Sequence, residues 1–170
     1  ALIRAAFDRG VTFFDTADVY GAGNSESLLG EFFAAHALKP VIATKIGRWA
    51  TPGWPYNFQR NWMLKHVEAS AKRLRTDALD IVQLHCIPTP ELVNGAVFET
   101  LREAKDAGLI RHFGASVESV EEGNLAIDHG AATLQIIFNI FRQKPAERLL
   151  GYAREKGVGI IVRLPLASGL

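Results

Sequence analysis

Four side chains that can bind or release a proton lie at the ends of apolar runs or shortly after one. Asp15 follows VTFF, Lys45 follows VIAT and His85 follows IVQL, while Tyr20 comes five positions after Asp15 in the segment DTADVYG. In a parallel α/β barrel the carboxyl ends of the strands meet on one face, and that face carries the chemistry. These four residues together there would form a proton-transfer site, which predicts an enzyme.

A short sequence motif that occurs four times indicates the elements that position these residues. An acidic residue, any residue and a glycine precede an apolar run four times, with the glycines at Gly10, Gly108, Gly130 and Gly157. Glycine can adopt, at little energetic cost, the left-handed conformation that ends a helix. Each copy of the motif therefore predicts a helix end followed by a strand. Asn24 and Ser25 suit a helix N-cap, and Pro145 suits the first turn of a later helix.

The strands are nearly continuous apolar runs, as in sheets that are covered on both faces. They are expected at residues 11–15, 41–46, 79–85, 110–116, 133–138 and 159–164. The predicted fold class is α/β, a parallel (β/α)8 TIM barrel that is incomplete here, with about six of its eight βα units. A Rossmann-like open sheet is the alternative, but no strand is followed by GxGxxG.

The amino-acid composition limits the classes of function that this protein can have. Hydrophobic residues make up 48%, charged residues 22%, and the net charge is +1, which is typical of a globular domain with no implied nucleic-acid or membrane partner. No apolar stretch is long enough to span a bilayer. Cys86 is the single cysteine, so an intrachain disulfide is excluded and a cytoplasmic location is expected. Oligomeric state is left open.

The segment from Asp15 to Gly21, followed by Asn24-Ser25-Glu26, resembles the signature of the aldo-keto reductase superfamily. The resemblance continues in the family's order over essentially the whole chain, through ATKIG, VQLHC, GLIRHFGAS, LQIIFN and RLPLASGL. It implies the reduction of an aldehyde or ketone to an alcohol by a nicotinamide cofactor inside a (β/α)8 barrel. The expectation of NADPH rather than NADH rests on the family alone.

The residues are suited to this chemistry, which requires a hydride on carbon and a proton on oxygen. Tyr20 can supply the proton, although a free phenol, with a pKa near 10, is a weak acid at neutral pH. A lysine ammonium at about 4 Å would favour the phenolate by roughly 4 kcal/mol at an effective dielectric constant of 20. Asp15 would orient Lys45, and His85 would donate a hydrogen bond to the carbonyl oxygen or share the proton.

Each residue also has a plainer interpretation when taken alone. Asp15 could cap a turn, Tyr20 could be a surface aromatic, Lys45 could be solvated, and His85 could be a core histidine. Their combination in family order favours the catalytic interpretation.

The resemblance also implies cofactor contacts. Ser116 and Gln135 match positions that hold the nicotinamide carboxamide, and Leu166 and Ser168 match a loop that passes the pyrophosphate. Arg163 stands where an aromatic residue commonly stacks on the nicotinamide, a role that a guanidinium plane can also fill. The expected cofactor-binding residues are Asp15, Ser116, Gln135, Arg163, Leu166 and Ser168. An ordinary loop serine is the alternative for Ser168.

The loop at residues 48–58 is rich in aromatic residues and leaves the strand that ends at Lys45. Trp49 and Trp54 are expected to line a pocket for bulky or apolar carbonyl substrates, together with Tyr20 and His85. These aromatic side chains could instead pack the loop onto the barrel. No metal site is expected.

In the family one strand precedes residue 1 and an eighth follows Leu170. Residues 1–170 are therefore expected to be a single barrel domain truncated at both ends, with the first and last strands exposing apolar edges. Two alternatives to an active reductase remain open. One is a nucleotide-binding regulatory subunit, like channel-associated members of the family, and the other is a fragment that is inactive alone.

Overall fold

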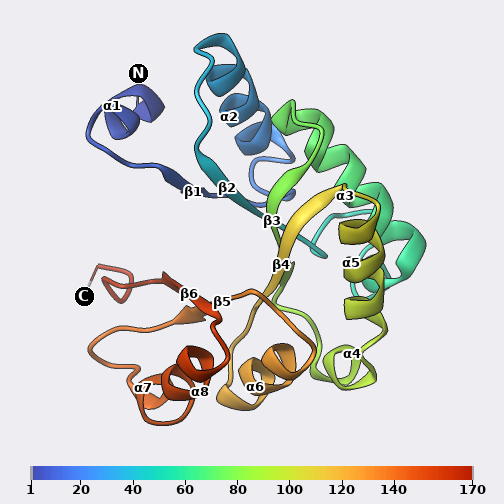
Figure 1. Cartoon of the computed structure of the whole chain (residues 1–170), viewed down its shortest axis with the longest axis vertical. Helices are drawn as coiled ribbons and strands as arrows, with labels where there is room; N and C mark the ends of the chain where they lie inside the picture. Colours follow the sequence, from blue (N-terminus) through green and yellow to red (C-terminus); the bar gives the residue numbers. More distant parts are fainter. Residues whose placement is uncertain (1, 170) are drawn as a thin grey trace.

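The computed structural model describes residues 2–169 and contains a sheet of six strands in sequence order, each parallel to its neighbours. The strands are β1 (Phe13–Asp15), β2 (Val41–Ile46), β3 (Leu79–His85), β4 (Ile110–Ser116), β5 (Thr133–Ile137) and β6 (Gly159–Arg163). The sheet curls, and the helices cover its outer side (Figure 1). This arrangement is an incomplete (β/α)8 barrel, as predicted. It excludes the Rossmann alternative, in which the strand order reverses at a switch point.

Helices connect successive strands in the part of the chain that the structure describes. They are α1 (Leu2–Asp8), α2 (Asn24–Ala35), η1 (Tyr56–Phe58), α3 (Arg60–Leu74), α4 (Thr89–Asn94), α5 (Ala96–Asp106), α6 (Val120–Asp128), α7 (Lys144–Arg148) and α8 (Leu150–Glu155). Among residues 2–169 no helix combines the length and the apolar character needed to cross a membrane.

Most element boundaries follow from the sequence pattern. The strands expected at 41–46, 79–85 and 110–116 are confirmed to the residue. The first strand is shorter than expected and begins at Phe13, while β5 and β6 each end one residue early. The four glycines of the repeated motif all have positive φ, between 69° and 87°. Their left-handed conformation confirms that they end helices before the strands.

Of the two expectations about helix starts, the cap of α2 needs correction and the place of Pro145 is confirmed. Neither Asn24 nor Ser25 caps α2, because the N-cap is Gly23, with φ 88° and no side-chain cap. The Ser25 hydroxyl instead forms a 2.7 Å hydrogen bond with the hydroxyl of Thr16, which ties α2 to the loop after β1. Pro145 does lie in the first turn of α7, but that helix ends at Arg148, and a separate helix, α8, follows.

The core lies between the sheet and the helices. Phe98 and Leu101 of α5, Met63 of α3 and Leu84 of β3 have no exposed surface. Each fully buried side chain of this size contributes about 1.5 to 3 kcal/mol through the hydrophobic effect. This packing fixes the strands, and the strands in turn fix the side chains at their carboxyl ends.

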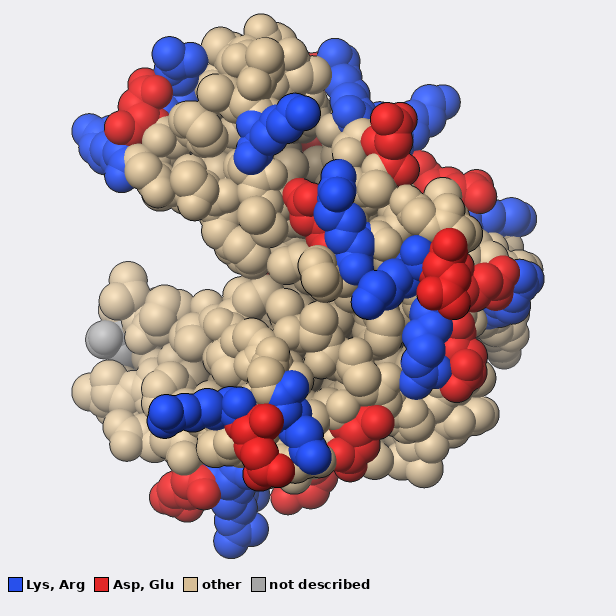
Figure 2. All heavy atoms as spheres, in the orientation of Figure 1, with Lys and Arg blue, Asp and Glu red and all other residues tan. Residues whose placement is uncertain are grey.

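The two edges of the sheet, β1 and β6, do not pair with each other. Figure 2 shows a notch between them, with walls formed mainly by uncharged residues. Apolar side chains are exposed on both edge strands, including Phe13 of β1 and Val162 of β6, which are 39% and 41% exposed. The expectation of exposed apolar edges is therefore confirmed.

Candidate active site

Lys45 lies at the carboxyl end of β2 and is only 1% exposed. Its ammonium donates hydrogen bonds to Asp15 Oδ2 at 2.8 Å and to the carbonyl oxygen of Thr16 at 2.6 Å. A buried charge is tolerated only when it is paired and hydrogen-bonded. Asp15, at the end of the neighbouring strand, meets that requirement.

The loop that carries Tyr20 is fastened to the same strand. The amide of Thr16 donates to the carbonyl of Ala43 at 2.8 Å, and the amide of Asp18 donates to the carbonyl of Lys45 at 3.0 Å, so the ladder between β1 and β2 continues past the end of β1. This places the Tyr20 ring with its centroid 4.9 Å from the Lys45 ammonium. Tyr20 is 42% exposed, so part of this residue faces solvent.

His85 approaches Tyr20 from the end of β3. The two rings meet edge to face, with centroids 5.9 Å apart. Burial, and secondly the positive charges of Lys45, Arg48 and Arg163, lower the pKa of His85 to about 4. The imidazole is therefore neutral at pH 7, a state in which one ring nitrogen donates and the other accepts.

The structure thus brings Asp15, Tyr20, Lys45 and His85 into one cluster at the carboxyl ends of the strands. Their catalytic roles stay predictions. Asp15 is held from a second side as well, because the amide of Gln135 on β5 donates to Asp15 Oδ1 at 2.8 Å. Both carboxylate oxygens of Asp15 therefore have a fixed partner.

Ser116, at the end of β4, and Gln135, in the middle of β5, pair across the two strands and are almost fully buried beside the cluster. Among residues 2–169 the Ser116 hydroxyl has one hydrogen-bond contact, a weak one of 3.7 Å to Cys86 Sγ. A hydroxyl and a primary amide on neighbouring strands match the donors and acceptors of a carboxamide. These two residues fit the expected nicotinamide site by their chemistry.

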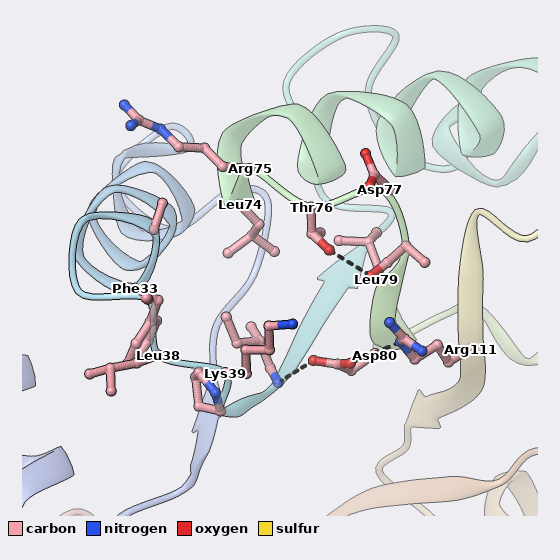
Figure 3. A pocket seen from close by; sticks show the side chains of 15 residues that line it. Phe33, Leu38, Lys39, Leu74, Arg75, Thr76, Asp77, Leu79, Asp80 and Arg111 are labelled. Carbon is pink, nitrogen blue, oxygen red and sulfur yellow. Dashed lines mark hydrogen bonds and ion pairs between the residues drawn. The ribbon is translucent and has the colours of Figure 1, made fainter.

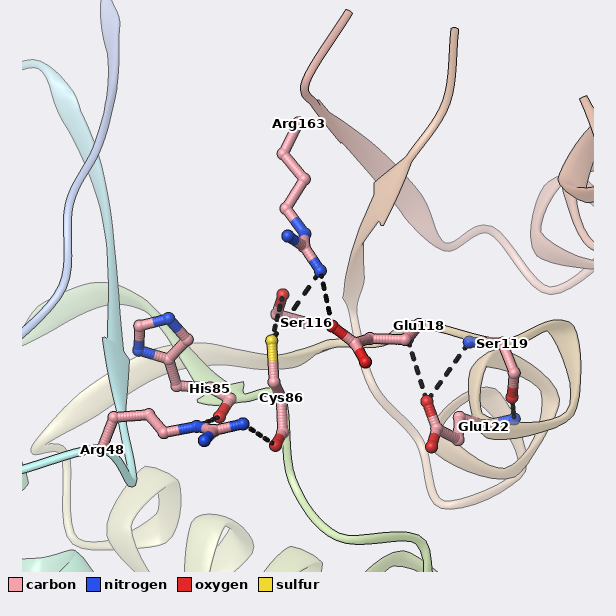
Figure 4. A network of polar contacts seen from close by, with 8 residues as sticks. All are labelled: Arg48, His85, Cys86, Ser116, Glu118, Ser119, Glu122 and Arg163. Carbon is pink, nitrogen blue, oxygen red and sulfur yellow. Dashed lines mark hydrogen bonds and ion pairs between the residues drawn. The ribbon is translucent and has the colours of Figure 1, made fainter. Parts of the chain in front are cut away.

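The other expected cofactor residues lie at and beyond the end of β6. One Arg163 nitrogen, Nη2, lies 3.8 Å from Cys86 Sγ and 3.4 Å from Glu118 Oε1 (Figure 4). Leu166 and Ser168 lie in the turn that follows β6, and both are exposed. Their predicted contacts with a pyrophosphate stay predictions.

The two tryptophans of the loop at 48–58 lie in different places. The Trp49 ring lies 5.1 Å from the guanidinium of Arg73, which belongs to α3 in the outer layer of helices. The Trp54 ring lies 4.0 Å from the guanidinium of Arg48. Arg48 in turn donates to the carbonyls of His85 and Cys86, so Trp54 is tied to the strand end that carries His85.

Arg48 and a buried polar cluster were not predicted from the sequence. In that cluster Glu26 of α2 has no exposed surface and accepts hydrogen bonds from Thr44 of β2 and, at 2.7 Å, from Arg73 of α3. Glu26 belongs to the signature segment, but its position alone does not distinguish a buried acid from a solvated one at a helix start. The cluster joins both helices to the strand that presents Lys45.

A cavity lies away from this site. It has a volume of about 470 Å³ and lies at the amino ends of β2 and β3, where Leu38, Leu74, Asp80 and Arg111 line it (Figure 3). In barrels of this class the amino-terminal face serves stability rather than catalysis. Within residues 2–169 no group of three or more His, Cys, Asp or Glu side chains could hold a metal ion.

Comparison with known proteins gives the same assignment. The model of the aldo/keto reductase family matches residues 1–170. The chain belongs to this family. It is 33% identical to the aldo-keto reductase YhdN of Bacillus subtilis over 175 residues, an alignment that covers 99% of this chain and 52% of YhdN.

Solved structures of aldo-keto reductases have the same fold. The holo form of AKR11C1 from Bacillus halodurans superposes with a TM-score of 0.88 at 26% identity, covering 98% of this chain and 57% of that one. An aldo-keto reductase from Klebsiella pneumoniae in complex with NADPH gives 0.82 at 25% identity, with the same coverage. The chain therefore spans little more than half the length of these relatives.

Proposed function

We propose that this aldo-keto reductase reduces an aldehyde or a ketone to an alcohol with NADPH. One observation carries the proposal, namely the contact of Tyr20 with both Lys45 and His85 at the catalytic end of the barrel. The similar Klebsiella protein was crystallised with NADPH, which supports that choice of cofactor. A cytoplasmic location is part of the same proposal.

In this proposal Tyr20 is the general acid. When bound, the nicotinamide supplies a hydride to the carbonyl carbon. The Tyr20 hydroxyl gives its proton to the carbonyl oxygen, and the resulting phenolate is stabilised by the adjacent ammonium of Lys45. The phenolate regains a proton from water after the alcohol leaves. Asp15 orients Lys45 through their 2.8 Å ion pair.

His85 orients the substrate. Because its imidazole is neutral, it can donate one hydrogen bond to the carbonyl oxygen without competing for the proton of Tyr20. Ser116 and Gln135 would hold the carboxamide, and Arg163, Leu166 and Ser168 would contact other parts of the cofactor. Trp54 would provide apolar surface beside the substrate.

The test is the replacement of Tyr20 in the intact protein. Tyr20→Phe removes the acidic hydroxyl and keeps the ring, so kcat for an aldehyde panel should fall by about 100-fold or more while NADPH still binds. Tyr56→Phe is the matched control, since this tyrosine is 58% exposed on η1, and it should leave kcat unchanged. NADPH binding without turnover of any carbonyl in the unmodified protein would favour the regulatory subunit instead.

A further inference from the structure

Three cations surround His85, and two of them have an acidic partner. Lys45 pairs with Asp15 at 2.8 Å, and Arg163 pairs with Glu118 at 3.4 Å. Across residues 2–169 no carboxylate forms an ion pair with Arg48. The positive charge beside His85 therefore exceeds the negative charge, and the excess is located on Arg48.

Arg48 is also held in one position. Its Nε donates to the carbonyl of His85 at 3.1 Å and its Nη2 to the carbonyl of Cys86 at 3.0 Å. The Trp54 ring covers one face of the guanidinium at 4.0 Å. Figure 4 shows Arg48 and Arg163 approaching the segment of His85 and Cys86 from different directions.

This fixed geometry leaves binding capacity on the guanidinium. A guanidinium has five N–H donors, and the two backbone carbonyls use two of them. Neutral carbonyl acceptors do not neutralise the positive charge. Because the side chain is already ordered, a ligand would not have to pay the entropy of immobilising it.

We propose that Arg48 makes this site selective for aldehydes or ketones that carry a carboxylate. The inference rests on the proposed function and names its substrate class. The carboxylate would bind the free edge of the Arg48 guanidinium, while the reacting carbonyl lies between Tyr20 and His85. The part of the substrate between the two groups would lie along Trp54. This placement agrees with the predicted preference for bulky or apolar carbonyl substrates.

The competing explanation is that Arg48 only fastens the loop at 48–58 to the end of β3. A fastening role predicts that its loss impairs neutral and anionic substrates equally. A charge-recognition role predicts a loss confined to the anionic substrate, chiefly through KM. Arg48→Gln separates these explanations because glutamine can still donate to a backbone carbonyl but has no charge.

The experiment compares 4-carboxybenzaldehyde with 4-methylbenzaldehyde in the intact protein with NADPH. The two aldehydes differ in intrinsic reactivity, so the informative quantity is the change in their kcat/KM ratio between protein variants. Arg48→Gln should lower the ratio by about tenfold or more, since a charge-assisted contact is lost for one substrate only. Arg154→Gln, an exposed arginine on α8, is the matched control and should leave the ratio unchanged.

A binding measurement keeps this inference separate from the proposed function. Calorimetry with 4-carboxybenzyl alcohol and 4-methylbenzyl alcohol requires no turnover. Carboxylate binding that depends on Arg48, with no turnover of either aldehyde, would support the site while overturning the reductase. If Arg48→Gln turns over both aldehydes with an unchanged kcat/KM ratio, whether or not both values fall, the inference is overturned and the reductase stands.

Discussion

Two aspartates of one segment have opposite environments. Asp15 has a partner on each carboxylate oxygen, whereas Asp18, three residues later, is buried and accepts no side-chain hydrogen bond on either oxygen from residues 2–169. Burial, and secondly the nearby charge of Glu26, raises the pKa of Asp18 to about 7. Backbone amides of Val19 and Gly47 and the charge of Arg73 lower this pKa only in part.

This pKa predicts a pH-dependent effect of Asp18→Asn on stability. Between pH 4 and pH 7 the folded protein keeps a proton on Asp18 that the unfolded chain has released, so Asp18 makes the free energy of unfolding fall as pH rises through this window. The asparagine variant lacks this dependence. It should match the unmodified protein near pH 4 and be more stable by roughly 1 to 3 kcal/mol at pH 8.

Urea unfolding at both pH values measures the difference. His85 also titrates in this range, because its pKa is lowered to about 4, but it is present in both proteins and cancels when they are compared. Equal stability differences at pH 4 and pH 8, or a less stable variant at pH 8, would show that Asp18 is charged and satisfied in the folded protein.

The sequence predicted the elements and the central site because both depend on local signals. Apolar runs bounded by a glycine indicate strands, and the polar residue at each strand end is then directed to the shared face of the barrel. Arg48 and the pairing of Glu26 with Arg73 depend instead on contacts between segments 37 to 47 residues apart. Periodicity contains no information about such contacts, so these residues could be identified only after the fold was known.

The close packing of α2 against α3 rests on Gly30. A Cβ atom at this position would overlap the carbonyl oxygen of Arg73 and the backbone of Leu74, neither of which can rotate away. Gly30→Ala must therefore separate the two helices, and the overpacking should cost about 1 to 3 kcal/mol of stability. Because Arg73 also pairs with Glu26, the displacement should disturb the segment that carries Tyr20 and lower kcat as well.

Gly151→Ala is the matched control for this prediction. Gly151 is also within a helix, α8, and an added Cβ atom there would meet nothing within 4 Å. The substitution should raise stability slightly, by about 0.5 to 1 kcal/mol, through the helix preference of alanine. Thermal unfolding of both variants decides the matter, and equal effects of the two substitutions would contradict the packing argument.

At the scale of the whole molecule, the two edge strands are the parts most prone to association with another chain. An edge strand presents unpaired backbone groups to solvent, and apolar side chains on it favour pairing with another chain. Both β1 and β6 have this combination, and the notch between them keeps each edge open (Figure 2). The polypeptide of residues 1–170 should therefore self-associate through these edges as its concentration rises.

Lysine substitutions on the edges test this last expectation. Charged side chains on an edge strand oppose pairing with a second edge, so Phe13→Lys combined with Val162→Lys should shift sedimentation velocity profiles of the 170-residue polypeptide towards the monomer. Val93→Lys changes an equally apolar side chain on α4, 61% exposed and outside the sheet, and should leave association unchanged. If the α4 variant reduced association as strongly as the edge variant, general surface hydrophobicity and not edge pairing would be the cause. A monomeric unmodified polypeptide at high concentration would show that these edges are protected in solution.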